Sequence, residues 1–515
     1  MILLLFSRLW VVPGLAVPGV LAYLFGLCIY RLLFHPYAQY PGPFLAKVSN
    51  FYSAYQAWTG NIHIDMGMCH KRYGSIVRYA PDRLLVNSAE AVSDVYSHSA
   101  KMLKSRTYDA LVHKAPNILT LRDKQLHGRR RRVLSQALSD ENITAYQPHM
   151  LEKVWKFAQV FLDLPREDEN EKWSVPFNIA RYCDYLTSDL MTRIVFSADY
   201  DMLGKADHRQ AIEAILDSNV RMSVLWQYPA IRSWKVHQLF FPAAIAARTV
   251  FLPFASRLVR DRMKLVRNEH LPLKDVFSFM ETAQDPATKM GLSPDEIAAE
   301  STTLIIAGVD TTSTSIAAVL FYLAKHPEYQ QRARMEIKSH FARGEDISLG
   351  AKMSACKFLS ACINEAMRLS PPVGSSLWRE AQADGVFVGG VHIPKGYDVG
   401  VGIWSMHHNP IHYPEPFTYR PERWLLQQGQ YAQNEPVGQA RDSALAAFMP
   451  FSRGPRSCIG KSFATAELMI TLAVVLWSLE WRIATGMDKD RNYDLKEHIT
   501  GAKNGPTLQF CAVSP

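Results

Sequence analysis

The chain has 515 residues, of which 48% are hydrophobic and 20% are charged, and its formal net charge is +9. This is ordinary globular composition, and no linker-like or repeated stretch divides the chain after residue 50, so we expect one large domain over 51–515. The 7 cysteines are scattered, odd in number and without a Cys-x-x-Cys pair. That pattern argues against a disulfide framework and for a reducing compartment.

Residues 9–30 carry no charged side chain and lie between Arg8 and Arg31. A helix over this run would be about 33 Å long, which is enough to cross the hydrocarbon core of a membrane. A cleaved signal peptide is the alternative, but its apolar part is usually shorter than this run. We therefore predict a transmembrane anchor over 9–30. The prolines that follow predict a stiff, extended hinge over 31–50, because each disfavours helix in the residue before it.

Arginine occupies every position from 129 to 132. Such a run occurs in nucleic-acid-binding proteins. Here, however, apolar residues recur on one helical face of the same segment, at Leu126, Val133 and Leu138. We therefore predict a helix that packs on the protein and presents a cationic side, and we expect no nucleic-acid partner.

The clearest predicted helix begins after Ser293 and ends before Pro327. Ser293 and Glu296 form a capping-box pattern, and a proline occupies the first helical position. The helix would be about 48 Å long and could cross a whole domain. Gly308 and the five hydroxyl residues 311–315 lie in its middle. Since these are poor helix formers, we expect a local widening there, where a ligand meets the backbone.

The most informative segment is the decapeptide that ends at Gly460, in which Cys458 follows an arginine by two residues. A structural cysteine in a Gly/Pro turn is the simpler interpretation. The neighbours favour an anionic sulfur ligand instead. Gly454 and Gly460 allow backbone N–H groups to approach the sulfur, and Phe451 is placed to exclude water from it. Arg456 offers a fixed cation for a negative group nearby.

The segment from Phe451 to Gly460 resembles the haem-binding loop of the cytochrome P-450 monooxygenases, Phe-x-x-Gly-x-Arg-x-Cys-x-Gly, and matches every fixed position. The resemblance implies haem b with its iron held by the Cys458 thiolate, an arrangement for which this family is the type case. It also implies the family's fold, mainly α-helical with small β regions near Ile76–Val86 and Gly385–Val401.

A second resemblance covers Ala307-Gly308-Val-Asp310-Thr311-Thr312, which is similar to the oxygen-binding helix of the same family. It implies that Ala307 and Gly308 lie against the haem, that Thr311 holds dioxygen by hydrogen bonds and that Asp310 supplies protons. A hydroxyl beside an acid can form such a proton relay. The structural alternatives are a Thr311 hydroxyl bonded to its own helix and a salt-bridged Asp310 carboxylate.

Glu365 and Arg368 are one helical turn apart in an apolar segment, and Arg423 follows in Pro-Glu-Arg-Trp. The family keeps such a glutamate and two arginines as a network behind the haem. The resemblance therefore implies that these three residues serve haem incorporation and not catalysis. It also assigns cations to the haem propionates: His127, Arg131, Arg379 and Arg456.

The resemblance implies a monooxygenase that inserts one oxygen atom from O₂ into a lipophilic small molecule. The loops look most like those of filamentous-fungal members that tailor polyketides, terpenoids or aromatic compounds. NADPH would supply electrons through a separate reductase, with cytochrome b5 as a further partner, and docking is expected on Arg129, Arg130, Arg132 and Lys461. The alternatives are a haem-thiolate isomerase or dehydratase that does not use O₂, and a non-catalytic haem-binding protein. Family members that act as isomerases or dehydratases commonly lack the threonine or the acid of the central helix, whereas this chain has both Thr311 and Asp310.

By the same resemblance the chain is a single-pass protein of the endoplasmic reticulum membrane, with its catalytic domain in the cytosol. Asn142-Ile143-Thr144 is an N-glycosylation sequon, which stays unmodified in that topology. We expect Asn142 or Asp140 to cap a helix instead.

Overall fold

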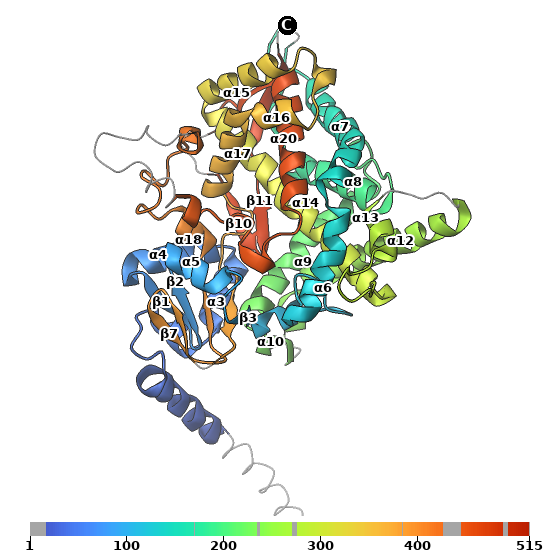
Figure 1. Cartoon of the computed structure of the whole chain (residues 1–515). Coiled ribbons are helices and arrows are strands. Elements are labelled where there is room, and N and C mark those ends of the chain that lie inside the picture. The colour runs from blue at the N-terminus through green and yellow to red at the C-terminus, as the bar shows by residue number, and fades with distance from the viewer. Residues whose placement is uncertain are drawn as a thin grey trace, which may run out of the picture.

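The computed structural model describes residues 17–168, 170–233, 237–269, 275–383, 385–425, 444–487 and 493–513. Helices make up most of it, and small sheets lie at one side of the helical body and between the helices (Figure 1). The mainly α-helical fold with small β regions is therefore confirmed.

The body is built from helices of very different length. Their bounds are α2 (Phe44–Val48), α3 (Phe51–Thr59), α4 (Ile62–Tyr73), α5 (Ala89–Tyr96), α6 (Lys124–Ala137), α7 (Asp140–Leu162), α8 (Ala180–Phe196), α9 (Arg209–Gln227), α10 (Ala230–Ser233), α11 (His237–Phe240), α12 (Pro242–Glu269), α13 (Val276–Thr282), α14 (Pro294–Lys325), α15 (Pro327–His340), α16 (Ala351–Ala355), α17 (Lys357–Leu369), α18 (Ile403–His407) and α20 (Lys461–Ser478). Short 3₁₀ helices are η2 (Arg106–Leu111), η3 (Gly344–Asp346), η4 (Pro421–Trp424) and η5 (Gly454–Arg456).

Helix α14 runs through the middle of the body (Figure 1). Its capping box is formed as predicted: Ser293 accepts the backbone N–H of Glu296, and the Glu296 side chain accepts that of Ser293. The helix ends at Lys325, just before Pro327. Every residue from 312 to 321 is buried, among α8, α17 and α20. The sequence thus gives the correct bounds of the element on which the candidate site is built.

The larger sheet has five described strands in the order β1-β2-β8-β5-β3, in which only β2 and β8 pair in parallel. It occupies both regions where strands were predicted. The smaller sheets join β4, β12 and β9, β6 and β7, and β10 and β11. The strand bounds are β1 (Ile76–Ala80), β2 (Arg83–Val86), β3 (Met102–Lys104), β4 (Phe177–Asn178), β5 (Arg379–Ala381), β6 (Val386–Val388), β7 (Val391–Ile393), β8 (Asp398–Gly400), β9 (Leu479–Ile483), β10 (Leu495–His498), β11 (Thr500–Lys503) and β12 (Thr507–Ala512).

The β10–β11 hairpin lies against the middle of α14. Thr314 of α14 donates a hydrogen bond to the carbonyl oxygen of Gly501 at 3.0 Å. A Cβ atom on Gly501 would lie 2.8 Å from Leu495 and 2.9 Å from Thr314. Glycine at 501 therefore allows the hairpin to approach the helix this closely.

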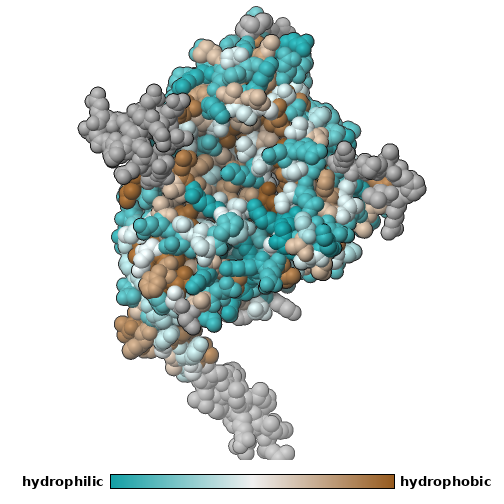
Figure 2. All heavy atoms as spheres, in the orientation of Figure 1, coloured by the Kyte–Doolittle hydropathy of each residue, from teal (hydrophilic) through white to brown (hydrophobic). Residues whose placement is uncertain are grey.

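The N-terminal helix projects from the body (Figure 1) and is apolar (Figure 2). It spans Val17–Phe34 with a mean hydropathy of 1.8 and no buried residue in that window. Residues 9–16 of the predicted anchor lie outside the described residues. The helix continues past the predicted end at residue 30, and its last turn is a π-helix over Tyr30–Phe34.

The predicted extended hinge is wrong for the part that follows this helix. Residues 35–40 form turns, and Tyr37 is only 1% exposed. Arg78 of β1 donates a hydrogen bond to the carbonyl oxygen of Arg31 at 2.7 Å. The segment is therefore folded onto the sheet, because its aromatic residues bury their rings there.

The predicted helix cap near the sequon is also wrong. Ser139 caps α7, accepting the backbone N–H of Asn142. Asn142 lies within the first turn and donates from its amide nitrogen to the carbonyl oxygen of Gln136 at 2.8 Å.

Candidate haem site

Cys458 lies in the turn between η5 and α20, as the loop pattern predicts. Its backbone N–H donates to the carbonyl oxygen of Phe451 at 2.8 Å. Gly454 has φ +67°, and a Cβ atom there would collide with the carbonyl oxygen of Tyr96. Glycine is therefore required for this turn, which fixes the position of the cysteine.

The Cys458 side chain is accessible although protein atoms surround it closely. Burial raises the pKa of its thiol, while the Gly460 backbone N–H and the Arg131 guanidinium act in the opposite direction. A coordinated metal cation would remove the remaining proton, since thiols bind metals as thiolates. This donor set fits an iron ion held by one sulfur.

The four residues predicted to hold propionates are brought together. Burial, and then Arg456, Lys104, Arg131 and Arg379, lower the pKa of His127 to about 2. The imidazole is therefore neutral at physiological pH, and it stands among four cations.

These cations donate to the backbone. Arg456 bonds the carbonyl oxygens of Leu121 and Arg122, both at 2.7 Å, and Arg131 bonds that of Ser457 at 2.6 Å. Arg379 bonds those of Leu377 and Trp378, both at 3.1 Å. Within the described ranges no carboxylate forms an ion pair with any of them. Buried and half-buried cations are unfavourable without a counter-charge, so this cluster fits a ligand that carries two negative charges. Haem, with its two propionates, is such a ligand.

Lys104 belongs to this cluster and was missed from the sequence. It is 4% exposed, and its Nζ donates to the carbonyl oxygens of Ile118, at 3.0 Å, and Leu119. Burial, and then Arg379, lower its pKa well below the ordinary value. Lys104 and Arg379 are register partners in β3 and β5, and this long-range pairing leaves no local signal in the sequence.

On α14, Ala307 is exposed although the helix is largely buried around it. The Thr311 hydroxyl donates to the carbonyl oxygen of Ala307 at 2.7 Å, which is the structural alternative weighed above. Its lone pairs remain able to accept a hydrogen bond. Ala307 and Thr311 thus offer an accessible, weakly polar helix surface.

The predicted widening of α14 is wrong, because the helix is α-helical throughout its bounds. Gly308 has a packing role: a Cβ atom there would lie 2.5 Å from the sulfur of Met191 on α8. Thr311, Ser313 and Ser315 bond carbonyl groups of their own helix, as Ser315 does with Thr311 at 3.0 Å.

Asp310 is 2% exposed and accepts hydrogen bonds at Oδ2 from Asn219 at 2.8 Å and from Thr500 at 2.9 Å. Burial, and then the Asp184 carboxylate, raise its pKa to about 6. The carboxyl group can therefore exchange a proton near neutral pH.

Glu365, Arg368 and Arg423 lie in one network. Arg368 donates to both carboxylate oxygens of Glu365 at 2.9 Å, and Arg423 donates to Oε1 at 2.9 Å. Trp424, which the sequence did not assign to the network, donates from Nε1 to Oε2 at 2.9 Å. Arg368 also bonds the carbonyl oxygens of His407 and Pro416. The network thereby joins α17 to residues 407–424, which precede the cysteine loop in the sequence.

The predicted docking role of the arginine run is wrong for Arg129 and Arg130. Their side chains are 13% and 4% exposed, and both pair with Glu296 at the start of α14. Arg130 also pairs with Glu300. These arginines face inward because acids of α14 neutralise them.

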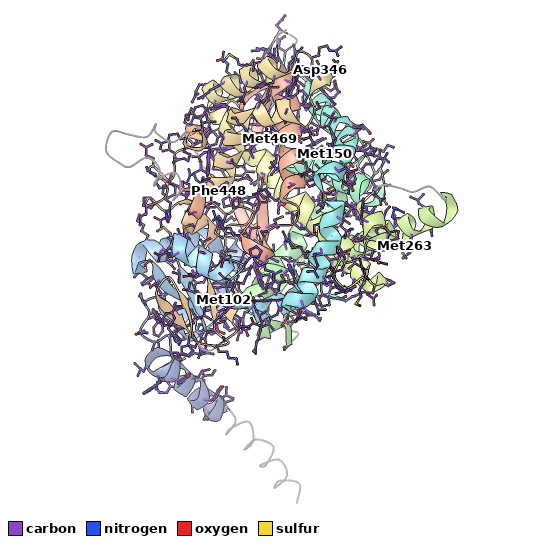
Figure 3. The ribbon with its side chains drawn as sticks, in the orientation of Figure 1. Met102, Met150, Met263, Asp346, Phe448 and Met469 are labelled. Atoms are coloured by element: carbon purple, nitrogen blue, oxygen red, sulfur yellow. The ribbon has the colours of Figure 1, made fainter. Side chains whose placement is uncertain are left out.

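The other two predicted docking cations differ from each other. Arg132 is 48% exposed but pairs with Asp285 at 2.5 Å. Lys461 is exposed at the start of α20. It borders a pocket of about 680 Å³ beside the cysteine loop. Phe448 and Met469, which are labelled in Figure 3, also line this pocket.

The chain matches the family model for cytochrome P-450 over residues 40–510. The cytochrome P-450 monooxygenase poxM of Penicillium oxalicum is 43% identical, over 95% of this chain and 92% of the relative. The cytochrome P-450 monooxygenase atnE of Emericella nidulans is 40% identical, over 96% of this chain and 95% of the relative. The chain therefore belongs to the cytochrome P-450 family, and it is a monooxygenase that holds haem by a cysteine thiolate.

Proposed function

We propose that this monooxygenase inserts one atom of O₂ into a lipophilic small molecule as a tailoring step of fungal secondary metabolism. The observation that carries the proposal is that the chain keeps a buried Asp310 and an accessible Thr311 side by side in the middle of α14, together with the complete loop around Cys458. An isomerase, a dehydratase or a non-catalytic haem protein would need no acid and hydroxyl there.

The assigned roles follow from the chemistry of the side chains. Cys458 is the iron ligand, and Gly454, Gly460 and Phe451 shape the turn that presents its sulfur and covers it from water. Arg131, Arg379 and Arg456, with neutral His127 as a hydrogen-bond donor and Lys104 as a fifth group, bind the propionates. Bound haem supplies the activation of O₂ and the transfer of one oxygen atom.

Asp310 and Thr311 hold and move protons. Thr311 presents its hydroxyl oxygen beside Ala307, where it accepts a hydrogen bond from a water molecule and so orients a proton carrier. Asp310, whose pKa of about 6 lies near the working pH, donates protons from within α14. The small side chain of Ala307 would leave room for a haem ring at this surface, whereas the space beside Gly308 is taken by Met191 of α8.

Electrons come from NADPH through a separate membrane-bound reductase, with cytochrome b5 as a second donor. Lys461 is the predicted docking cation that remains exposed, and it lies close in sequence to Cys458. The apolar helix Val17–Phe34 supports a membrane anchor. We place the chain in the endoplasmic reticulum membrane with residues 51–515 as a cytosolic catalytic domain.

Membranes that contain the protein and a fungal NADPH–cytochrome reductase test the proposal. The reduced protein should give the red-shifted carbon monoxide band of thiolate ligation, and Cys458→Ser should abolish that band. A library of lipophilic compounds should then contain members that raise NADPH and O₂ consumption and gain one oxygen atom by mass spectrometry. A normal carbon monoxide band without NADPH-dependent O₂ consumption would instead support an isomerase or a haem carrier.

A further inference from the structure

The Asp310 carboxylate is held by a closed triangle of hydrogen bonds. Asn219 Nδ2 donates to Asp310 Oδ2 at 2.8 Å and to Thr500 Oγ1 at 3.1 Å. Thr500 Oγ1 in turn donates to Asp310 Oδ2 at 2.9 Å. Asn219 and Thr500 are each only 8% exposed. The triangle is therefore a satisfied polar contact within the protein, where a lost partner is costly.

The two donors come from parts of the chain that are remote from α14. Asn219 lies on α9, and Thr500 begins β11 of the hairpin that packs on α14. The environment of the Asp310 carboxylate oxygen therefore depends on the positions of both elements, because its hydrogen-bond donors move whenever α9 or the hairpin moves. Neither donor is needed to form α14, whose own capping box and apolar packing account for the helix.

A buried ion pair stands beside the triangle. Lys503 of β11 bonds Asp184 of α8, and it also bonds the Ser313 hydroxyl at 2.8 Å. Ser313 donates to Asp184 at 2.8 Å. Asp310 therefore lies near the negative charge of Asp184 and near the positive charge of Lys503, which neutralises Asp184. The first raises the pKa of Asp310 and the second lowers it. The only hydrogen bonds that the described residues make to the Asp310 side chain come from Asn219 and Thr500.

We propose that Asn219 and Thr500 are positioning residues of the oxidation reaction: they fix the direction in which Asp310 presents its proton toward Thr311. Two donors to one oxygen leave the other oxygen of the carboxyl group to carry and release the proton. With either donor removed, the carboxyl group rotates freely and delivers protons less efficiently. This inference rests on the proposed function, in which Asp310 is the proton donor.

The alternative is that the triangle only fastens α9 and the hairpin to α14. A matched control separates these roles. Thr314 lies one helical turn from Asp310, is fully buried, and donates to the Gly501 carbonyl oxygen of the same hairpin at 3.0 Å. Thr314→Val therefore loosens the same hairpin from the same helix and leaves the bonds to Asp310 in place.

The experiment compares Asn219→Ala, Thr500→Val and Thr314→Val in reductase-containing membranes without added substrate, so that no unidentified ligand is needed. Thr500→Ser is the conservative rescue variant, and Asn219→Ser replaces Asn219→Ala if the latter does not fold. Haem content and the carbon monoxide band identify the folded variants. The readouts are NADPH-dependent O₂ consumption, hydrogen peroxide per NADPH and the pH profile, each normalised to cytochrome c reduction by the same reductase.

We expect Asn219→Ala and Thr500→Val to slow O₂ consumption about tenfold and to raise the peroxide fraction. The alkaline limb of their pH profile, where Asp310 loses the proton that it donates, should move to higher pH, because both donors favour the charged carboxylate and their loss raises the pKa of Asp310. Thr500→Ser and Thr314→Val should retain the wild-type profile. Equal effects of Thr314→Val and Thr500→Val would overturn this inference but leave the proposed function standing. A wild-type protein with a normal carbon monoxide band and no NADPH-dependent O₂ consumption would overturn the proposed function, and this inference with it.

Discussion

Lys104 and Arg379 face each other as register partners across the antiparallel strands β3 and β5. Like charges directly opposite each other destabilise a sheet, and here both side chains are 4% exposed. Among the described residues, each donates only to uncharged oxygen atoms. An anion bound by both would remove this repulsion, and a haem propionate is an anion of the required kind.

Lys104→Met should therefore weaken haem retention and leave the free energy of unfolding of the haem-free protein unchanged or raised. Loss of one charge-assisted bond of about 1.5–3 kcal/mol corresponds to roughly 10–100-fold faster haem release. Transfer of haem to an excess of an apo-haem protein measures this rate. Lys101→Met, an exposed lysine on the same chain segment, should release haem at the wild-type rate. If both variants do so, Lys104 is not a propionate ligand.

Glu365→Gln should prevent accumulation of the haem-loaded protein. The substitution leaves two guanidinium groups, of Arg368 and Arg423, without their counter-charge, at 0% and 5% side-chain exposure. Breaking such a pair costs about 3–5 kcal/mol. Chemical denaturation and the haem-to-protein ratio provide the measurements. Glu422→Gln, which removes a partly exposed pair with Arg332, should change stability by less than about 1 kcal/mol.

Gly308→Ala should destabilise the protein by about 1–3 kcal/mol, because the added methyl group overlaps Met191 of α8. A double-variant cycle with Met191→Ala tests the cause. The methyl group gains space when Met191 is truncated, so the double variant should be more stable than the sum of the single effects predicts. Additive effects would show that Gly308 is required for another reason.

The elements that the sequence predicts well have local signals. The bounds of α14 depend on Ser293, Glu296 and Pro327, which act within one turn of the helix ends. The turn around Cys458 depends on a decapeptide whose glycines and arginine are fixed in spacing. The central widening of α14 was expected because a run of hydroxyl residues is unfavourable in an isolated helix, and tertiary packing outweighs that preference.

The elements that the sequence could not predict arise from long-range packing. Lys104 joins the cation cluster through strand pairing with Arg379, a residue more than 270 positions away. Arg129 and Arg130 were expected to face a partner, because a single segment does not reveal the acids that neutralise them. Those acids, Glu296 and Glu300, lie on α14. Charge patterns therefore predict a cationic helix face but not whether that face meets solvent.

The pH dependence of stability should depend on Asp310. Burial and the Asp184 carboxylate raise its pKa from 3.8 to about 6. Between these values the folded protein keeps a proton that the unfolded chain has released, so stability is lost as the pH rises from about 4 to 6. Asp310→Asn cannot titrate, and its free energy of unfolding should fall less over this range, by up to ~3 kcal/mol. Asp163→Asn, at an exposed position, should follow the wild-type curve; an unchanged slope in Asp310→Asn would contradict the assignment.

The sequon at Asn142 should remain unglycosylated in a fungal host, because the catalytic domain is proposed to face the cytosol. The side chain is half-buried and donates to the Gln136 carbonyl oxygen, so the test needs a topology control. A variant with an added Asn-Gly-Thr tail before residue 1 places an acceptor on the other side of the anchor. Endoglycosidase treatment should shift the electrophoretic mobility of the tailed protein and not that of the wild type. A shift in the wild type that Asn142→Gln abolishes would place the domain in the lumen, where a cytosolic reductase could not reach it.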